Sequence, residues 1–391
     1  MTGPLRGLKV LELAGIGPTP YACMLLADLG ADVLRLERGN FDASPETSWD
    51  ILNRSRPSVA LDLKNTAGRG LVLELAEQAQ VLVEGFRPGV TERLGLGPDE
   101  VWLRNPKLIY ARMSGYGQQG PLSQRAGHDL NYIAVSGALW PIGRAGDRPV
   151  PPLNLVGDFA GAAFLAFGIL AAVRHAEATG EGQVVDVAMV DTSASMMAMT
   201  YSFINEGLWH EYRGTNLLDS GAHFYDTYET SDGKYVAVAA IEAKFYEQLL
   251  LGLDVADENL PPQMKRSTWP SMKERFTSIF ATKTREEWTT IFEGVDACVT
   301  PVLSPLEASK HRYNTERNVF SDDEVIQPSP VPRFSRTPGS ISRPPSSSGS
   351  GTREGLSRWG IDDERLALLR ETGAFGSGNV PSHEVPRPSN S

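Results

Sequence analysis

The chain has 391 residues, of which 41% are hydrophobic and 22% charged, and its formal net charge at neutral pH is −11. This length is enough for two domains with sizeable cores, and the composition is typical of a globular protein. The negative charge excludes a broad nucleic-acid-binding surface, so an anionic ligand must be bound by a local group of basic residues. The two cysteines, Cys23 and Cys298, are too few for a disulfide framework. Their apolar neighbours predict two buried, reduced thiols in a reducing compartment.

The sequence predicts neither a membrane span nor a targeting signal. The longest apolar run, residues 160–173, is shorter than the roughly 20 residues that cross a bilayer as a helix. The first residues lead into a strand without the apolar region of a secretory signal, and the last residues differ from the peroxisomal Ser-Lys-Leu. We therefore expect a cytoplasmic protein, with the peroxisome and the mitochondrion left open.

The beginning of the chain predicts a βαβ unit. A buried strand, a glycine-rich turn, a helix and a second strand are expected at residues 8–13, 14–18, 19–29 and 31–37. Such a unit implies a parallel sheet with right-handed crossover connections. Gly15, Gly17 and the acidic Glu37 about 20 residues later partly match a dinucleotide-binding motif, but Pro20 occupies the third glycine position. A turn that packs the helix on the strand is the preferred interpretation.

Helices and strands continue to alternate as far as residue 210. They are expected at residues 66–78 (helix), 80–84 (strand), 98–105 (helix), 107–112 (strand), 157–176 (a strongly apolar helix), 183–188 (strand) and 190–210 (helix). This alternation predicts an α/β domain in which helices cover a mostly parallel sheet.

The pattern changes after residue 220. Residues 224–240 predict a hairpin around Asp232-Gly233, and helices are expected at 242–252, 270–282 and 284–293. We therefore divide the chain into a large α/β domain (1–219), a small α+β domain (220–310) and a return segment (311–391). Within the last, residues 327–352 are rich in proline, serine and glycine and predict an extended or mobile connection. Residues 353–372 are expected to be helical and 374–391 frayed.

Two side chains have the context of acid/base groups. His128 lies in the polar turn 126–132, which opens a predicted helix, and Asp158 precedes the apolar helix. Taken singly, each fits a helix cap at least as well as a catalyst. A histidine near neutrality and a partly buried carboxylate are nevertheless the groups that general acid/base chemistry uses.

Basic residues gather in the first quarter of the chain, and several of them follow predicted strands, where α/β folds bind ligands. They are Arg38, Arg54, Arg56, Lys64, Arg87 and Arg93. The planar guanidinium of arginine can donate two hydrogen bonds to one phosphate. The alternative for each of them is an ordinary surface charge.

The order of these motifs resembles the family III CoA-transferases (CaiB–BaiF) and, within them, the α-methylacyl-CoA racemases. The matching stretches are LKVLELAGIGPTPYACMLLADLGADVLRLER, VLVEGFRPGVTERLGLGP, MSGYGQQGP, GHDLNY, NLVGDFAG, GQVVDVAMV, FYDTYETSDGKYVAVAAIEAKFYEQL and DACVTPVL. They cover most of residues 7–310, and the resemblance weakens after about residue 320.

The resemblance implies roles for particular residues. His128 matches a histidine that exchanges the α-proton of the substrate on one face, and Asp158 matches an aspartate that serves the other face. Glu242 in AIEAKFYE matches a glutamate that supports the histidine. Contacts to coenzyme A (CoA) are expected at Arg38, Leu61, Asp62, Leu63, Lys64, Glu84, Gly85, Phe86, Arg87, Arg93, Gly127, Asp129, Leu130, Asn131 and Tyr132.

The resemblance also implies the assembly and the reaction. The expected fold is an interlocked homodimer, in which each subunit has a Rossmann-like large domain built from both chain ends and a smaller domain between them. The sites are expected where the subunits meet. The implied activity is the interconversion of (2R)- and (2S)-2-methylacyl-CoA thioesters in fatty acid metabolism, with no metal and no separate cofactor, because CoA is part of the substrate.

Racemisation next to a thioester removes a proton from one face of the carbon and returns one to the other face. Two acid/base groups on opposite faces are sufficient for this reaction. We expect both His128 and Asp158 to begin helices, whose free N–H groups would stabilise the enolate oxygen between them.

Three other functions stay open. In a CoA-transferase of this family Asp158 would be the nucleophile, but such enzymes generally lack a histidine at position 128 and carry a glycine-rich loop where this chain has residues 240–243. A catalytically silent CoA-binding protein would not need His128, Asp158 and Glu242 together. A nicotinamide-dependent enzyme is disfavoured by the incomplete glycine motif.

The acyl chain of the substrate cannot be read from the sequence. Racemases of the group tend to bind it on methionine-rich surface, and Met189, Met196, Met197 and Met199 would suit this role. The preferred alternative is a buried helix in which these methionines fill the core.

Overall fold

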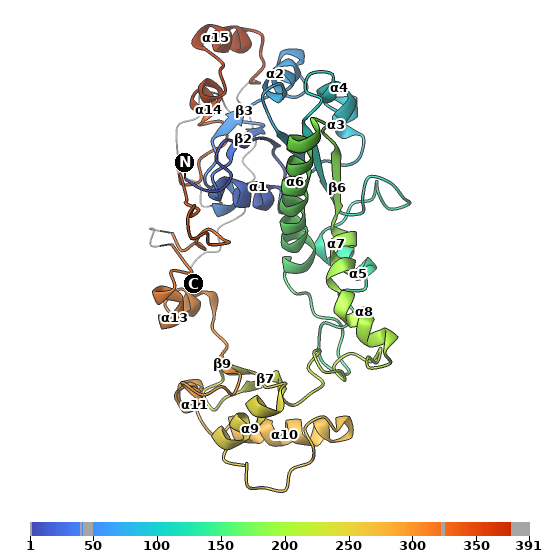
Figure 1. Ribbon diagram of the computed structural model, residues 1–391, viewed down its shortest axis with the longest axis vertical. Coiled ribbons are helices and arrows are strands. Elements are labelled where there is room, and N and C mark those ends of the chain that lie inside the picture. Colours follow the sequence, from blue (N-terminus) through green and yellow to red (C-terminus); the bar gives the residue numbers. More distant parts are fainter. Residues whose placement is uncertain (1, 40, 42–49, 322–324, 377–391) are drawn as a thin grey trace, which may run out of the picture. The chain divides into compact units, whose positions relative to one another are not determined.

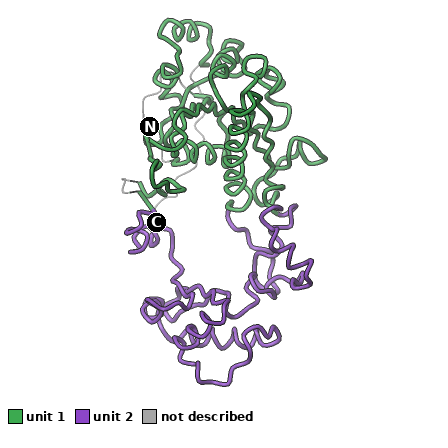
Figure 2. Tube along the Cα trace, in the orientation of Figure 1, with its two compact units in different colours: residues 1–133, 154–193, 320–391 green, residues 134–153, 194–319 purple. Residues whose placement is uncertain are grey.

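The computed structural model describes residues 2–39, 41, 50–321 and 325–376. The chain forms two compact units, one of residues 1–133, 154–193 and 320–391, and one of residues 134–153 and 194–319 (Figure 2). The larger unit thus contains segments from near both ends of the chain. Residues 134–153 and 194–219, which we assigned to the large domain, belong instead to the smaller unit.

The larger unit is built on a parallel sheet of six strands (Figure 1). In chain order the strands are β1 (Lys9–Leu13), β2 (Asp32–Glu37), β3 (Ser58–Ala60), β4 (Val81–Glu84), β5 (Ile109–Ser114) and β6 (Val184–Ala188). Their order in the sheet is β3-β2-β1-β4-β5-β6, the order of doubly wound dinucleotide-binding folds. The predicted α/β class is confirmed, although sequence patterns did not indicate β3.

Helices cover both faces of this sheet because strands β1, β2 and β4 carry buried apolar residues on both sides. On one face α1 (Pro18–Asp28) and α6 (Ala160–Thr179) pack with Val10, Val33 and Val83. On the other face α2 (Thr66–Ala76), α14 (Thr352–Arg358) and α15 (Asp363–Glu371) pack with alternate residues of the same strands. Cys23 of α1 is buried in the first of these cores as predicted.

Several predicted helices are shorter than expected. The remaining helical segments of the larger unit are η1 (Ile51–Asn53), α3 (Val90–Arg93), α4 (Pro98–Trp102), α5 (Asp129–Val135, which ends in the smaller unit) and α7 (Met189–Met196). The helix predicted over 190–210 is therefore divided into α7 and α8 (Ala198–Asn205). The helix predicted over 353–372 is interrupted at Gly360, whose φ of 82° ends α14 in a left-handed conformation.

Helix α6 is longer than the apolar run that predicts it. It continues from a π-helical turn, η2 (Leu155–Phe159), and together they span 25 residues, Leu155–Thr179. By length and composition alone this segment could cross a membrane, so the prediction that it is too short was wrong. The core helix of a globular protein meets the same criterion, and α6 packs against α1, β5 and β6.

The segment predicted to be extended or mobile is irregular but fixed to the sheet edge. Gly351 N donates to Ser58 O of the edge strand β3, and Ser340 N donates to Asp28 O. The guanidinium of Arg54 donates to Gln327 Oε1 (2.9 Å) and Pro328 O (2.7 Å). Since these hydrogen bonds satisfy a buried cation and backbone carbonyls of β3 and α1, the segment completes the larger unit. Among the residues predicted to fray, Ala374 and Phe375 are buried, and 377–391 lie outside the described residues.

The smaller unit is an α+β structure. Strands β7 (Tyr225–Glu229), β8 (Tyr235–Ala239) and β9 (Val299–Pro301) form an antiparallel sheet, and the predicted hairpin is confirmed. Helices α9 (Ala243–Gly252), α10 (Trp269–Phe280) and α11 (Arg285–Phe292) cover it with an aromatic core. Short helical segments occur at η3 (Arg266–Thr268), α12 (Pro305–Ala308) and α13 (Arg312–Glu316). Cys298 is free but only partly buried, unlike the prediction of two buried thiols.

Candidate active site

The candidate active site is a cavity of about 590 Å³ at the carboxyl ends of the parallel strands. Part of its wall comes from segments at the ends of four strands, namely 16–19 after β1, 85–88 after β4, 113–116 at the end of β5 and Met189 after β6. β1 and β4 are neighbours in the sheet, although the chain passes from β1 to β2 and β3 on the other side. The connections after β1 and after β4 therefore lead to opposite edges of the sheet. Open α/β sheets bind ligands at such a point. His128 and Asp158 both line the cavity.

His128 is held by the first turn of α5. Its backbone N–H donates to Asn131 Oδ1 (3.1 Å), and its carbonyl accepts from the N–H groups of Asn131 and Tyr132. The imidazole is exposed to the cavity. The prediction that this residue stands at the start of a helix is confirmed.

Asp158 lies inside the π-helical turn η2, so the prediction that it caps a helix is wrong. The capping position belongs to Asn154, whose side chain donates to Asp158 Oδ2 (3.1 Å). Partial burial raises the pKa of the Asp158 carboxyl above its ordinary value, and the nearby Asp129 raises it further. The hydrogen bond from Asn154 and the charge of His128 act in the opposite direction. His128 is therefore close enough to Asp158 for their charges to interact.

Asp129 joins the two candidate catalytic segments. It is almost completely buried, and its Oδ1 accepts from Gly157 N (2.6 Å) and from Asp158 N (2.8 Å). The other oxygen, Oδ2, is buried without a hydrogen-bond partner among the described residues. Asp129 does not line the cavity, and the contacts that the structure shows for it are to the backbone that carries Asp158, so its contact to CoA stays a prediction. The amides of residues 157 and 158, which we expected to bind the enolate oxygen, are occupied by this carboxylate.

Tyr132 supports the loop that carries His128. Its hydroxyl donates to Gly127 O, and its ring lies so close to Gly115 that a Cβ there would be 2.1 Å from the ring. Burial raises the pKa of Tyr132 to about 12, so the hydroxyl keeps its proton as a donor. Tyr132, Gly127 and Asn131, three of the predicted CoA contacts, line the cavity, whereas Leu130 does not.

A second cavity, of about 410 Å³, lies at the carboxyl ends of β2 and β3. It is lined by the predicted CoA contacts Arg38 and Leu61, Asp62, Leu63 and Lys64. Phe86 lines both cavities, so the two are neighbours along the loop after β4. Two cations and apolar walls suit a nucleotide with phosphate groups.

Glu84 and Arg93, also predicted to contact CoA, line neither of these cavities. Glu84 is buried, its Oε2 accepts from Phe86 N (2.7 Å), and its Oε1 is 3.4 Å from Arg112 Nε. Burial raises the pKa of Glu84 to about 7 despite these contacts. Glu84 thus fixes the backbone of the loop that carries Phe86 and Arg87, through its hydrogen bond with Phe86 N.

Comparison of the sequence with known proteins identifies the family of this chain. Residues 5–352 match the sequence profile of CoA-transferase family III. The chain belongs to this family. It is 46% identical to the α-methylacyl-CoA racemase of Mus musculus over 370 residues (93% of this chain and 96% of the relative). It is 43% identical to the racemase of the same name from Homo sapiens over 383 residues (96% and 98%).

Solved structures of the family share the fold. The crystal structure of Rv3272 from M. tuberculosis superposes with a TM-score of 0.75 at 27% identity, covering 90% of this chain and 99% of that one. The family resemblance drawn from the motifs is therefore confirmed.

The dinucleotide interpretation finds no support in the loop after β1. The missing Cβ of Gly17, whose φ is 73°, would lie 3.3 Å from Asp158 Oδ2, so the loop closes on the candidate catalytic carboxylate. Glu37 accepts hydrogen bonds from Arg35 (2.6 Å) and Ser58 (2.5 Å). The turn is needed for close packing beside Asp158.

Two of the early arginines are structural. Arg54 pairs with Asp28 at 2.6 Å and Arg56 with Glu12 at 2.6 Å, and all four side chains are buried. Neither guanidinium is available to a ligand, because both are buried and each is paired with a buried carboxylate.

Glu242 belongs to the smaller unit, where it stands exposed at the N-cap of α9. The larger unit therefore brings together His128 and Asp158 without it, and the support of His128 by Glu242 stays a prediction. The methionines belong to both units. Met189, in the larger unit, is buried on the cavity wall, whereas Met196 and Met199, in the smaller unit, are about half exposed. The exposure of the latter two contradicts the interpretation as core filler.

Sequence patterns missed one basic residue of the cavity, Arg125. It precedes His128 by three residues in a polar loop, and that spacing was the only signal available for it.

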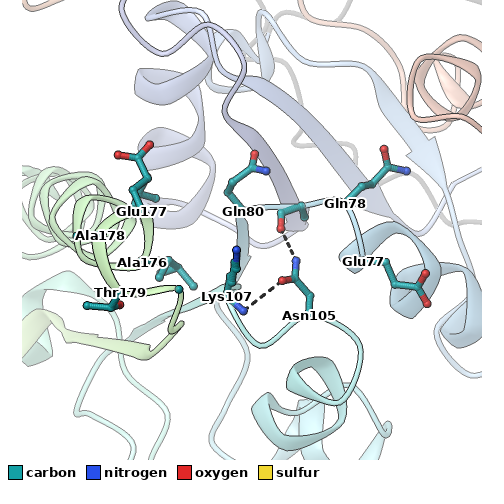
Figure 3. A pocket seen from close by; sticks show the side chains of 13 residues that line it. Glu77, Gln78, Gln80, Asn105, Lys107, Ala176, Glu177, Ala178 and Thr179 are labelled. Carbon is teal, nitrogen blue, oxygen red and sulfur yellow. Dashed lines mark hydrogen bonds between the residues drawn. The ribbon is translucent and has the colours of Figure 1, made fainter.

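A further cavity, of about 650 Å³, lies at the opposite end of the strands (Figure 3). Gln80 and Lys107, just before β4 and β5, and the last turn of α6 line it. Asn105 there already donates to Ala76 O and Ala79 O, and its oxygen accepts from Lys107 N. The side chain of Asn105 is thus already bound to backbone atoms. The cavity at the carboxyl ends of the strands is therefore the better candidate for the active site.

Proposed function

We propose that this chain is a racemase of 2-methylacyl-CoA thioesters, an isomerase that interconverts their (2R)- and (2S)-forms. The observation that carries the proposal is that His128 and Asp158 line one cavity at the branch point of the sheet. The 46% and 43% identity to proteins named α-methylacyl-CoA racemase over nearly the full chain supports the same activity.

In one direction the carboxylate of Asp158 removes the α-proton, and the C–H electron pair moves onto the thioester oxygen to give an enolate. The imidazolium of His128 then returns a proton to the opposite face, and the reverse direction exchanges the two roles. Partial burial, which raises the pKa of Asp158, makes this carboxylate a stronger base than one in water. A stronger base suits the weakly acidic C–H bond beside a thioester.

The enolate oxygen needs donors that are in place before the reaction. The amides of Gly157 and Asp158 are already bound by Asp129 Oδ1, so the proposal requires other donors on the cavity wall. The CoA portion then extends over Phe86, which borders both cavities, towards Arg38 and Lys64.

Assembly, cofactor use and compartment belong to the same proposal. A homodimer is supported by apolar residues exposed on α6, among which Phe167 is 71% exposed. Two free cysteines support the cytoplasm, a reducing compartment. Both acid/base groups come from the chain itself, so we propose that no metal and no separate cofactor take part. Size-exclusion chromatography with light scattering and dialysis against a chelator test the first and the last of these points.

The activity is tested by incubating the protein with one enantiomer of a 2-methylacyl-CoA in D₂O, with no acceptor acid present. A racemase incorporates deuterium at the α-carbon and abolishes the optical activity. Absence of exchange, combined with CoA transfer once a carboxylic acid is added, would refute the proposal and favour a transferase with Asp158 as nucleophile. Binding of CoA without either reaction would identify a CoA-binding protein.

Variants then test the two residues. His128→Ala and Asp158→Ala are each expected to abolish racemisation while CoA binding is kept. His175→Ala, an exposed histidine near the end of α6, is the matched control and retains activity. Full activity in either of the first two variants would remove that residue from the mechanism.

A further inference from the structure

Thr19 presents an unused hydroxyl group to the candidate active-site cavity. The residue lines the cavity from the first turn of α1 and is only 2% exposed. Within the part of the chain that the structure describes, its hydroxyl has no hydrogen-bond partner. A buried hydroxyl without a partner costs free energy, so in a native protein such a group requires a reason. An oxygen atom of a ligand in the cavity would supply the missing acceptor.

The fold leaves space for this hydroxyl at Gly85, the residue that follows β4. A Cβ on Gly85 would lie 2.5 Å from Thr19 Oγ1 and 3.5 Å from Thr19 Cβ, so a larger residue there would collide with the hydroxyl. Gly85 also lines the cavity. The Thr19 hydroxyl therefore lies where the segments after β1 and β4 meet, at the point of the sheet where α/β folds bind ligands.

The helix that carries Thr19 is packed against the turn of Asp158. Gly17, two residues before Thr19, approaches the carboxylate so closely that a Cβ there would lie 3.3 Å from Asp158 Oδ2. Two residues after Thr19, the ring of Tyr21 packs edge-on against Phe159, with 4.8 Å between the ring centroids. Because the chain on both sides of Thr19 contacts the Asp158 turn, the hydroxyl and the carboxylate belong to the same part of the cavity.

Two other hydroxyl groups of the cavity already have acceptors. The hydroxyl of Ser123 donates to Gly120 O (3.0 Å), and that of Tyr132 donates to Gly127 O. The hydroxyl of Thr19 is free to donate, and it is uncharged. A neutral donor stabilises an enolate without placing a positive charge near the carboxylate that removes the proton. Such a charge would favour the ionised form of the carboxylate and make it a weaker base.

We propose that the Thr19 hydroxyl donates a hydrogen bond to the thioester oxygen and stabilises the enolate that forms there. This inference rests on the proposed function, and it adds a catalytic residue to His128 and Asp158. When the α-proton leaves, the C–H electron pair moves onto this oxygen, and the developing negative charge strengthens the hydrogen bond. The hydroxyl keeps its own proton, so the two acid/base groups still perform both proton transfers.

Thr19→Val tests the inference, because it replaces the hydroxyl with a methyl group of similar size. Removing one donor to a developing oxyanion typically lowers kcat about a hundred- to a thousandfold, so the kcat of α-deuterium exchange should fall about a hundredfold while KM changes far less. The urea midpoint should stay at or above that of the wild type, because the lost hydroxyl is buried and has no partner. Thr19→Ser keeps a hydroxyl and should restore most of the exchange rate.

Thr192→Val is the matched control. Thr192 is buried in the same unit, but its hydroxyl donates to Met189 O (3.1 Å) within α7, and the residue does not line the cavity. This variant leaves the exchange rate unchanged.

Three results would overturn the inference. One is an unchanged kcat in Thr19→Val. Another is a kcat that falls together with the urea midpoint, since the hydroxyl would then stabilise the fold. The third is a shift of the acid limb of kcat/KM in Thr19→Val, because Thr19 would then act through the carboxyl of Asp158 and not on the substrate.

A failure of the proposed function has a different signature. If the wild-type protein exchanges the α-proton of neither enantiomer, the racemase proposal fails. Calorimetry with a 2-methylacyl-CoA and with its thioether analogue, in which a CH₂ group replaces the carbonyl, then decides whether Thr19 binds the thioester oxygen. The loss of a neutral hydrogen bond weakens binding about two- to tenfold, so Thr19→Val should weaken the thioester by this factor and leave the thioether unchanged. Unchanged thioester binding, or equal weakening of both ligands, would overturn the inference.

Discussion

Asp129 offers the sharpest test of how the fold prepares the two catalytic groups. Its Oδ1 accepts from Gly157 N at 2.6 Å and from Asp158 N at 2.8 Å. Asp129→Ala leaves two buried N–H groups without an acceptor, and each of them costs about 1–3 kcal/mol. We therefore expect a loss of about 2–6 kcal/mol in the free energy of unfolding, measured by urea denaturation, together with a loss of racemase activity.

Asp129→Asn separates the hydrogen bonds from the charge. The amide oxygen of asparagine still accepts from both N–H groups, but the negative charge that helps burial to raise the pKa of Asp158 is removed. The pKa of Asp158 then falls towards its ordinary value. In the direction in which Asp158 is the base, activity is lost as the pH falls through this pKa, so the acid limb of kcat/KM moves to lower pH.

The assay is the rate of α-deuterium exchange against pH, started from each enantiomer in turn. Only the enantiomer whose proton Asp158 removes is expected to show the shifted acid limb. The reasoning is refuted if Asp129→Asn folds with near wild-type stability and its acid limb coincides with that of the wild type. If Asp129→Asn loses as much stability as Asp129→Ala, the reasoning is also contradicted, because the charge of the carboxylate, and not its hydrogen bonds, would then stabilise the turn of Asp158.

Three further predictions concern the framework of the site. Arg54→Ala leaves the buried Asp28 without its partner and should destabilise the protein by about 3–5 kcal/mol; an unchanged urea midpoint would contradict this. Burial raises the pKa of Glu84 from 4.5 to about 7, so between these values the folded protein holds a proton that the unfolded chain releases. The free energy of unfolding therefore decreases as the pH rises through this range, and Glu84→Gln should remove that slope in urea titrations. Gly115→Ala places a Cβ 2.1 Å from the ring of Tyr132 and should reduce deuterium exchange by displacing the loop of His128; wild-type exchange would count against it.

Local patterns in the sequence were sufficient for the elements. The hairpin around Asp232-Gly233 and the alternation of helices and strands were predicted because periodicity and turn residues act within a few positions of the chain. The motifs around His128 and Asp158 identified the candidate acid and base, and the structure brings both to one cavity.

The partner of each charged side chain was decided only by the tertiary structure. Arg54 looked like a ligand-binding residue, but it donates to Gln327, 273 positions away, and so fixes a segment that appeared mobile. Asp129 was predicted from its motif as a CoA contact, and only the structure shows that it holds the turn of Asp158. A sequence shows that a charge is present, whereas burial and the oxygen or nitrogen that faces it depend on segments that meet only when the chain folds. The sequence by itself therefore determined which residues are able to move a proton, and the folded chain decided which carboxylates and arginines hold them in position.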